Sequence, residues 1–196
     1  MRRLSWIILL LTFVFTFFPS ALTFANDNKN SYYVLKGGVY FPQNDDVKDF
    51  VDDGINLEVA VGTFTSEYFG AELGVGFFQT RTTEGAKVTT KFFPITFNLL
   101  GKYSDGPFDI YGGGGMGAYI NKTEVTINAD SDSDLHTSYG FQALVGGKYY
   151  LLKDYFVGME GKYIWTQTPQ QTLMGVPLPD LHYDGFIVTV NVGARY

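Results

Sequence analysis

The sequence predicts an all-β fold, an eight-stranded antiparallel up-and-down transmembrane β-barrel. Three observations predict it. Eight segments of the 196-residue chain carry apolar side chains at every second position, which places those side chains on one face of a β-strand. The connections between these segments are alternately short and long. The opposite faces of the same segments carry charged side chains, which argues against a soluble barrel with an apolar interior.

The N-terminal segment has the composition of an export signal. Two arginines precede an apolar stretch at residues 6–18, and small residues around Ala25 suit cleavage by a signal peptidase. The apolar stretch spans about 13 residues, whereas a transmembrane helix needs roughly 20. We therefore expect residues 1–25 to be a cleavable signal peptide and residues 26–196 to be one β-barrel domain.

Charge and hydropathy restrict the partners of the mature chain. Loss of the two arginines of the signal would change the net charge from −6 to −8. An acidic chain without a basic run argues against a nucleic-acid partner. Beyond residue 25, no apolar stretch reaches the length of a membrane-spanning helix. The mature chain could therefore cross a membrane only as strands that close into a barrel, because lipid cannot satisfy free backbone groups.

The eight expected strands follow one another along the chain. The first apolar row lies at 33–41, the fifth segment, 108–121, is rich in glycine, and the last row lies at 186–196. Each strand is expected to have about 10–12 residues, enough for a tilted strand to cross a bilayer. The remaining apolar rows lie at 55–61, 69–77, 93–103, 139–149 and 157–165.

Short and long connections alternate between these strands. This alternation is expected of a barrel with short periplasmic turns and long external loops. A soluble β-sandwich or a lipocalin-like barrel is the alternative, although it would turn its apolar rows inward. The tight links lie at 65–67, 104–107 and 152–154, and the long polar segments at 42–53, 80–91, 122–137 and 167–184.

Charged side chains alternate with the apolar rows and are expected to face the barrel interior. Buried charges need partners, which oppositely charged neighbours can supply. Such pairs would plug and rigidify a closed barrel, whereas the alternative is a polar conduit. The bore of an eight-stranded barrel is barely wide enough for side chains, which favours the plug. The predicted lumen charge network comprises Lys36, Glu58, Glu72, Lys102, Lys148, Glu160, Lys162 and Arg195.

Aromatic residues mark the ends of the expected strands. They make up 17% of the chain, and two bands of them predict the interfacial girdles of a membrane barrel. Near the short turns these residues are Tyr68, Tyr103, Tyr149, Tyr150, Tyr155 and Tyr196, and near the long loops they are Phe41, Phe77, Tyr163, Trp165 and Phe186.

Several segments resemble small bacterial outer-membrane β-barrels. Residues 94–103 lead through a short turn into the glycine-rich run 111–117, as in the central hairpin of these proteins. Residues 181–184 and 193–196 are similar to the end of the OmpW family, and OmpX- and OmpA-type barrels share the architecture. The resemblance covers essentially all of the mature chain. It implies a location in the outer membrane of a Gram-negative-type bacterium, among outer-membrane lipid and lipopolysaccharide.

The resemblance also implies insertion by the barrel-assembly machinery. In these proteins the assembly signal lies in the last strand and includes a terminal aromatic residue. The positions that match it here are Phe186, Val188, Val190, Val192, Ala194 and Tyr196.

One of the long loops is unusually apolar. An exposed apolar patch usually marks a binding surface, so we expect residues 171–181 to cover the barrel mouth, contact lipid or line a pocket. In the OmpW family a hydrophobic pocket near the mouth is thought to pass small apolar compounds toward the membrane. The residues expected to contact such a ligand or to gate the mouth are Leu173, Met174, Val176, Leu178 and Leu181.

The leading hypothesis is therefore a narrow or laterally opening conduit for small hydrophobic molecules, with no catalytic residue, cofactor or metal. The alternative is a non-transporting barrel that stabilises the envelope or binds a surface partner. A lipid-modifying enzyme comes third, because His136 lies near Ser138 and His182 near Asp184. Small barrels resembling PagP and PagL use histidine with serine, but the spacing here matches neither family.

Overall fold

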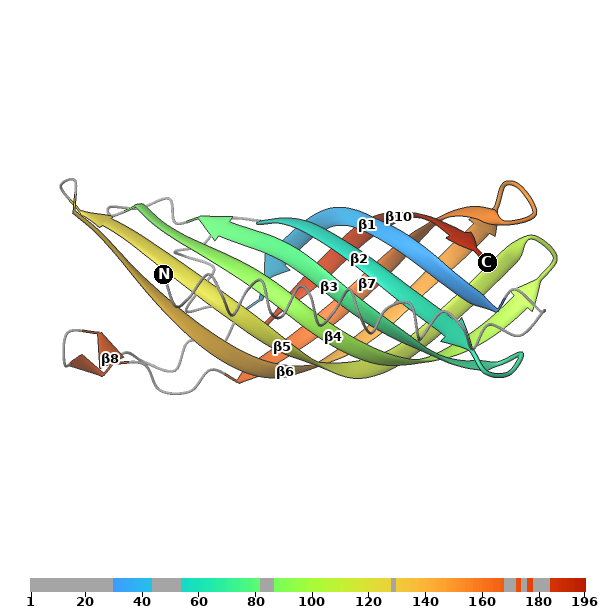
Figure 1. Cartoon of the computed structure of the whole chain (residues 1–196), viewed down its shortest axis with the longest axis horizontal. Coiled ribbons are helices and arrows are strands. Elements are labelled where there is room, and N and C mark those ends of the chain that lie inside the picture. Colours follow the sequence, from blue (N-terminus) through green and yellow to red (C-terminus); the bar gives the residue numbers. More distant parts are fainter. Residues whose placement is uncertain are drawn as a thin grey trace.

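The chain folds into a closed antiparallel barrel. The computed structural model describes residues 30–43, 54–81, 87–127, 130–167, 172–173, 176–177 and 184–196. Eight strands pair in the order β1-β10-β7-β6-β5-β4-β3-β2, and β10 closes the barrel against β1 (Figure 1). The predicted all-β, eight-stranded architecture is confirmed. The expected signal peptide, residues 1–25, lies outside the described residues.

The strands fall into two length classes. Five barrel strands have 11–13 residues, and three consecutive strands have 19–21 residues. No helix in the described segments is long and apolar enough to cross a membrane. The barrel strands are β1 (Ser31–Pro42), β2 (Gly54–Phe64), β3 (Phe69–Arg81), β4 (Lys87–Asp105), β5 (Phe108–Ile127), β6 (Asp130–Tyr150), β7 (Tyr155–Gln167) and β10 (Gly185–Arg195), and a separate hairpin joins β8 (Thr172–Leu173) to β9 (Val176–Pro177).

The expected strand length of 10–12 residues is wrong for the central strands. β4, β5 and β6 have 19, 20 and 21 residues, and most of the polar segments 80–91 and 122–137 is strand rather than loop. Pairing continues to Lys87↔Thr126 and Ile127↔Asp130, and Figure 1 shows β4, β5 and β6 extending beyond β3. Antiparallel pairing satisfies backbone groups whatever the side chains, so a polar extension carries no apolar row to reveal it.

The three short turns are confirmed and lie at one end of the barrel, together with the C-terminal residue (Figure 1). The tightest joins β4 to β5, where Asp105 pairs with Phe108. Gly106 adopts a φ of +59° there, a conformation that side chains with a Cβ rarely adopt. The opposite end of the barrel carries the long hairpins.

The apolar rows face outward, as their period of two predicts. Leu35, Val59 and Val145 are 55%, 56% and 62% exposed. Ala194 is an exception, because it is buried opposite Tyr33, whose ring stacks on Tyr196. Tyr150, which was expected in the interfacial girdle, does not face outward. Since neighbouring residues of a strand face opposite sides, Tyr149 takes the outer position, and Tyr150 packs against the interior.

The interior is layered. Along β1, Lys36 lies between Val34 and Tyr40, which belong to two separate apolar clusters. The turn-side aromatic layer, toward the short turns, comprises Tyr32, Val34, Ala60, Phe64, Leu100, Tyr111, Leu144 and Phe156. The hairpin-side apolar layer, toward the long hairpins, comprises Tyr40, Phe78, Phe92, Tyr119, Ile164 and Ile187.

Candidate functional site in the barrel lumen

Lys36 stands at the centre of the lumen and contacts three carboxylates. Its Nζ lies 2.7 Å from Glu72 Oε1, 2.9 Å from Glu160 Oε2 and 3.1 Å from Glu58 Oε1. The ammonium donates hydrogen bonds to Glu72 and to both oxygens of Glu160. An ammonium group has three protons, so Glu58 Oε1 gains the charge contact without a hydrogen bond.

Lys162 completes this group of charges from β7. Its Nζ donates to Glu58 Oε2 at 2.6 Å and lies 3.7 Å from Glu160 Oε1. The barrel register places Lys36 directly opposite Glu58 on the neighbouring strand. All of these side chains are at most 4% exposed. We call Lys36, Glu58, Glu72, Glu160 and Lys162 the charged layer.

Two phenol hydroxyls also donate hydrogen bonds to carboxylates of the charged layer. Tyr32 donates to Glu72 Oε2 at 2.8 Å, and Tyr111 donates to Glu160 Oε2 at 2.9 Å. Neither tyrosine is among the residues predicted from the sequence for the lumen network. A signal was available for Tyr32, because it lies four residues from Lys36 and so shares its face of the strand.

Two amides extend the layer across the lumen. Asn98 donates to Glu72 Oε1 at 3.5 Å, and Gln142 donates to the Asn98 side-chain oxygen. Gly115 lies between them in the sheet. A Cβ at Gly115 would overlap the Phe97 carbonyl and the Asn98 side chain, so glycine leaves the space in which Asn98 and Gln142 meet.

Lys148 is held by aromatic rings rather than by a carboxylate. Its Nζ lies 3.5 Å from the ring centroid of Tyr32, 4.7 Å from that of Tyr111 and 5.0 Å from that of Phe156. A cation over ring faces is attracted by their negative quadrupole. Because Tyr32 and Tyr111 also bind glutamates of the charged layer, Lys148 is linked to that layer through these two rings.

Lys102 and Arg195 lie at the turn-side mouth, away from the charged layer. Lys102 Nζ is 4.0 Å from Asp109 Oδ2 and 4.4 Å above the Phe64 ring. Arg195 stacks 3.8 Å above the Tyr150 ring and donates to the Lys153 carbonyl at 3.0 Å. Of the eight residues expected to form one lumen network, the structure brings five together. Lys102, Lys148 and Arg195 have other partners.

The barrel wall is interrupted between β3 and β4. Pairing there runs to Val75↔Ile95 and resumes at Phe78↔Phe92, so Gly76 and Phe77 lack paired partners on β4. Pro94, which would face Gly76, has no N–H to donate to the ladder. Inside the barrel the Phe78 and Phe92 rings stack at 4.3 Å, and outside it Phe77 and Phe93 lie 5.4 Å apart. Aromatic rings thus cover this break on both faces.

The apolar loop at 171–181 is described only in part. The backbone of Leu173 pairs with that of Val176 in the β8–β9 hairpin. Met174, Leu178 and Leu181 lie outside the described residues. The role of this loop in ligand binding or gating stays a prediction.

The row expected to signal assembly lies on β10 and ends at Tyr196. Phe186, Val190 and Val192 are exposed on the outer face, Val188 and Tyr196 are half-buried, and Ala194 is buried. Its role as an assembly signal also stays a prediction.

Two partners in the enzyme alternative can be placed. Asp184 is half-buried, and its Oδ1 accepts a hydrogen bond from the Thr166 N–H at 2.7 Å. Ser138 is buried, and its hydroxyl accepts a hydrogen bond from Asn121 Nδ2 at 2.8 Å. The side chain of His136 lies outside the described part of the chain, as does the whole of His182.

A closed barrel with an apolar outer surface and paired charges inside is a transmembrane β-barrel. The chain belongs to the outer membrane protein beta-barrel domain family, whose profile matches residues 8–195. It is therefore a protein of the outer membrane of Gram-negative bacteria. This membership confirms the location and the class of protein that the resemblance implied. No curated protein sequence matches the chain.

Solved structures of small outer-membrane barrels are similar to the chain. OprG from Pseudomonas aeruginosa aligns with a TM-score of 0.62 and 17% identity, covering 85% of this chain and 96% of that one. Ail, the attachment invasion locus protein of Yersinia pestis, aligns with a TM-score of 0.51 and 14% identity, covering 85% and 99%. Outer Membrane Protein W of E. coli has a TM-score of 0.47 and 18% identity, covering 85% and 98%. At these identities the likeness to OprG and Ail shows the fold alone.

Proposed function

We propose that this protein is a narrow, laterally opening conduit that passes small hydrophobic molecules from the external surface into the membrane, without enzymatic activity. The observation that carries the proposal is the break in the β3–β4 ladder at Pro94. It lies in the barrel wall beside the hairpin-side apolar layer, where Phe78 and Phe92 belong to both.

The charged layer supports a lateral rather than an axial route. An apolar molecule that moved down the bore would have to separate buried ion pairs and leave polar groups without partners, which is costly. Below the charged layer, Lys148 and its rings fill the bore again. The hairpin-side apolar layer contains no charged residue, and a molecule that displaced its side chains would meet the wall at the break.

Four phenylalanine rings at the break would rotate to open the lateral route. No backbone ladder holds Gly76 and Phe77 to β4, so local separation of the strands breaks fewer hydrogen bonds there than elsewhere in the wall. Rotation of the Phe78–Phe92 pair on the inside and of the Phe77–Phe93 pair on the outside would join the apolar interior to lipid.

A reversible cross-link tests this route. The chain contains no cysteine, so the double variant Phe77→Cys/Phe93→Cys carries only the introduced pair. Oxidation should lock the break and lower the transfer of N-phenylnaphthylamine into proteoliposomes by about tenfold or more, equivalent to roughly 1.4 kcal/mol. Reduction of the disulfide should restore the transfer.

The matched control locks an intact part of the wall. Val59 and Val75 pair directly across β2 and β3 and both face outward. Oxidised Val59→Cys/Val75→Cys should transfer the dye at the wild-type rate. Equal transfer by the reduced and oxidised forms of the variant at the break would overturn the lateral route.

A second candidate function is a non-transporting barrel that stabilises the envelope or binds a surface partner. It is favoured by the burial of the charged layer and of the turn-side aromatic layer inside the bore. This candidate predicts no dye transfer above protein-free vesicles for the wild-type protein, in addition to the insensitivity of both cysteine pairs.

A further inference from the structure

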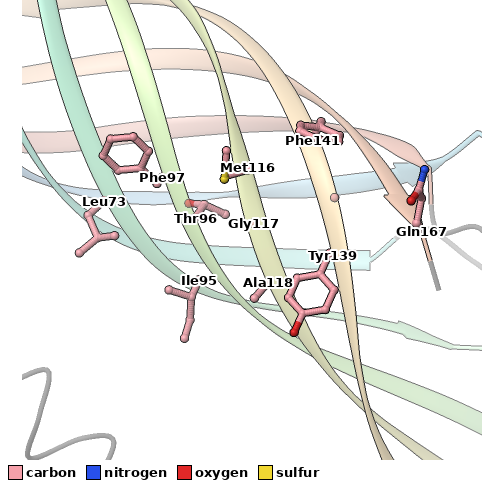
Figure 2. A pocket seen from close by; sticks show the side chains of 11 residues that line it. Leu73, Ile95, Thr96, Phe97, Met116, Gly117, Ala118, Tyr139, Phe141 and Gln167 are labelled. Carbon is pink, nitrogen blue, oxygen red and sulfur yellow. The ribbon is translucent and has the colours of Figure 1, made fainter. Parts of the chain in front are cut away.

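A hollow of about 380 Å³ lies on the lipid-facing surface over β4, β5 and β6. Its centre is Ala118 of β5, which stands between Ile95 and Tyr139 on the neighbouring strands. One rung further, Met116 stands between Phe97 and Phe141. Figure 2 shows these two rows of side chains side by side. The hollow exists because a single methyl group occupies the position between two large side chains.

The position of the hollow along the barrel points to the external leaflet. Tyr139 lies opposite Gln167, the last residue of β7, and both residues line the hollow at the end away from the short turns. The short turns of such barrels face the periplasm, so the hollow opens toward the outer half of the apolar band. Tyr139 is 65% exposed, as a residue of the interfacial girdle would be.

Packing, rather than hydrophobicity, decides what fills a hollow of this kind. Lipid chains are as apolar as leucine, so there is no hydrophobic force between the protein and its lipid. A flat apolar wall therefore selects no lipid. A concave wall surrounds a chain with more neighbouring atoms, and each close atom pair adds dispersion attraction. A hollow of this volume falls within the range of small-molecule sites, which is about 300–1,000 Å³.

The polar groups at one end of the hollow determine the orientation in which an acyl chain would bind. The Tyr139 hydroxyl and the Gln167 amide can donate hydrogen bonds to the ester or amide carbonyl at the head of an acyl chain. Apart from Thr96, the rest of the lining is apolar or glycine, from Ile95 and Ala118 to Met116 and Phe97. An acyl chain would thus have its polar end at the interface and its methyl end toward the middle of the bilayer.

We propose that this hollow is a binding site for one acyl chain of lipopolysaccharide, the lipid of the external leaflet, and that it holds this lipid beyond ordinary solvation by the bilayer. The site lies on the outer surface and does not depend on the proposed conduit. Two features of the hollow identify lipopolysaccharide as the occupant. The hollow lies in the external half of the apolar band, and its hydrogen-bond donors lie at the external end.

Filling the hollow tests the proposal. Ala118→Phe should occupy the space of the chain while it leaves the lumen untouched, because residue 118 faces outward. The matched control is Ala143→Phe, an exposed outward alanine of β6 whose neighbours in the sheet are Gly114 and Tyr163. The measurement is the binding of purified lipopolysaccharide, and separately of phosphatidylethanolamine, to the folded barrel in nanodiscs by native mass spectrometry.

The expected results are specific. The wild-type protein and Ala143→Phe should retain lipopolysaccharide equally and in preference to phosphatidylethanolamine. Ala118→Phe should lower retention by about tenfold or more, and Tyr139→Phe, which removes one donor, by about threefold to tenfold. Equal retention by the two phenylalanine variants would overturn the site. Equal retention of both lipids by the wild-type protein would overturn lipopolysaccharide as its occupant, and a wild-type dimer that Ala118→Phe converts to monomer would identify the hollow as a contact between copies.

Discussion

At the scale of the residue, Lys36 determines how the lumen is held together. It is 1% exposed and lies within 3.1 Å of three carboxylates from three strands. A buried ion pair is weak evidence for stability, because desolvation offsets much of the attraction. Its removal is costly for a different reason, since the remaining charges stay buried without a partner. The charged layer therefore specifies which strands meet more than it adds net stability.

The first prediction concerns this lysine. Lys36→Met leaves Glu58 and Glu160 close to Lys162, and it leaves Glu72 without an ion pair to any described residue. The free energy of unfolding should fall by about 3–5 kcal/mol, measured by urea titration of the barrel in detergent micelles. The control is Lys153→Met in an exposed short turn, which should change it by less than about 0.5 kcal/mol. Similar effects of the two substitutions would mean that water reaches the charged layer.

The second prediction concerns Lys148 and its rings. Lys148→Met keeps the apolar body of the side chain and removes the ammonium from above Tyr32, Tyr111 and Phe156. The loss of a desolvated cation–π contact should lower the free energy of unfolding by about 2 kcal/mol, followed by tyrosine fluorescence during unfolding. Lys148→Arg should lower it less, because a guanidinium also stacks on rings. A stability unchanged in Lys148→Met would exclude the cation–π interpretation.

At the scale of the element, the period of two predicted the strands and their faces, as at β10, because every outward position needs an apolar side chain in lipid. It did not predict the extensions of β5 and β6. Thr123 and Asp134 pair in the ladder without an apolar row on either side. It also did not predict the break at Pro94. Whether a missing N–H matters depends on which neighbouring strand it would have faced, and that is a property of the sheet.

The third prediction tests the independence of the long hairpin. Replacing residues 124–133 with Asn-Gly would join Thr123 to Asp134, which already pair across the two strands, through a two-residue turn of the preferred type. No residue of the charged layer is removed. The shortened protein should show the wild-type difference in gel mobility between heated and unheated samples. A protein that migrates as unfolded without heating would show that the extension is needed for barrel formation.

At the scale of the whole molecule, closure of the barrel explains why the candidate site was only partly predictable. The sequence indicates which charges face inward, since that follows from strand parity. It does not indicate that Glu160 of β7 meets Lys36 of β1 while Lys148 meets rings, because these contacts run across the bore and depend on how the closed strands are staggered. Away from the turn-side mouth, the buried lumen charges Lys36, Lys148 and Lys162 balance Glu58, Glu72 and Glu160, whereas buried Asp109 lies at the mouth beside Lys102. The balance of charge depends on the placement of Lys102 and Arg195 at the turn-side mouth, which strand parity does not predict.

The last prediction concerns the seam at which β1 pairs with β10. Tyr196 donates its backbone N–H to Ser31 at 2.9 Å, and its ring stacks on Tyr33 with centroids 6.0 Å apart. Tyr196→Ala should lose the ring contact, worth about 0.5–1.5 kcal/mol beyond its buried area, and Tyr196→Phe should retain it. Tyr103→Ala is the control, since Tyr103 belongs to the same girdle, is 65% exposed and lies away from the seam.

Two measurements separate the stability of the seam from recognition during assembly. In refolding into detergent, Tyr196→Ala should reach the folded, fast-migrating form at a reduced yield, because the last contact that closes the barrel is weakened. In cells, if Tyr196 is also part of the assembly signal, the loss of folded protein from the outer membrane should exceed the loss in detergent, while Tyr103→Ala loses no more in cells than in detergent. Equal losses of Tyr196→Ala in the two settings would limit Tyr196 to a role in closing the seam.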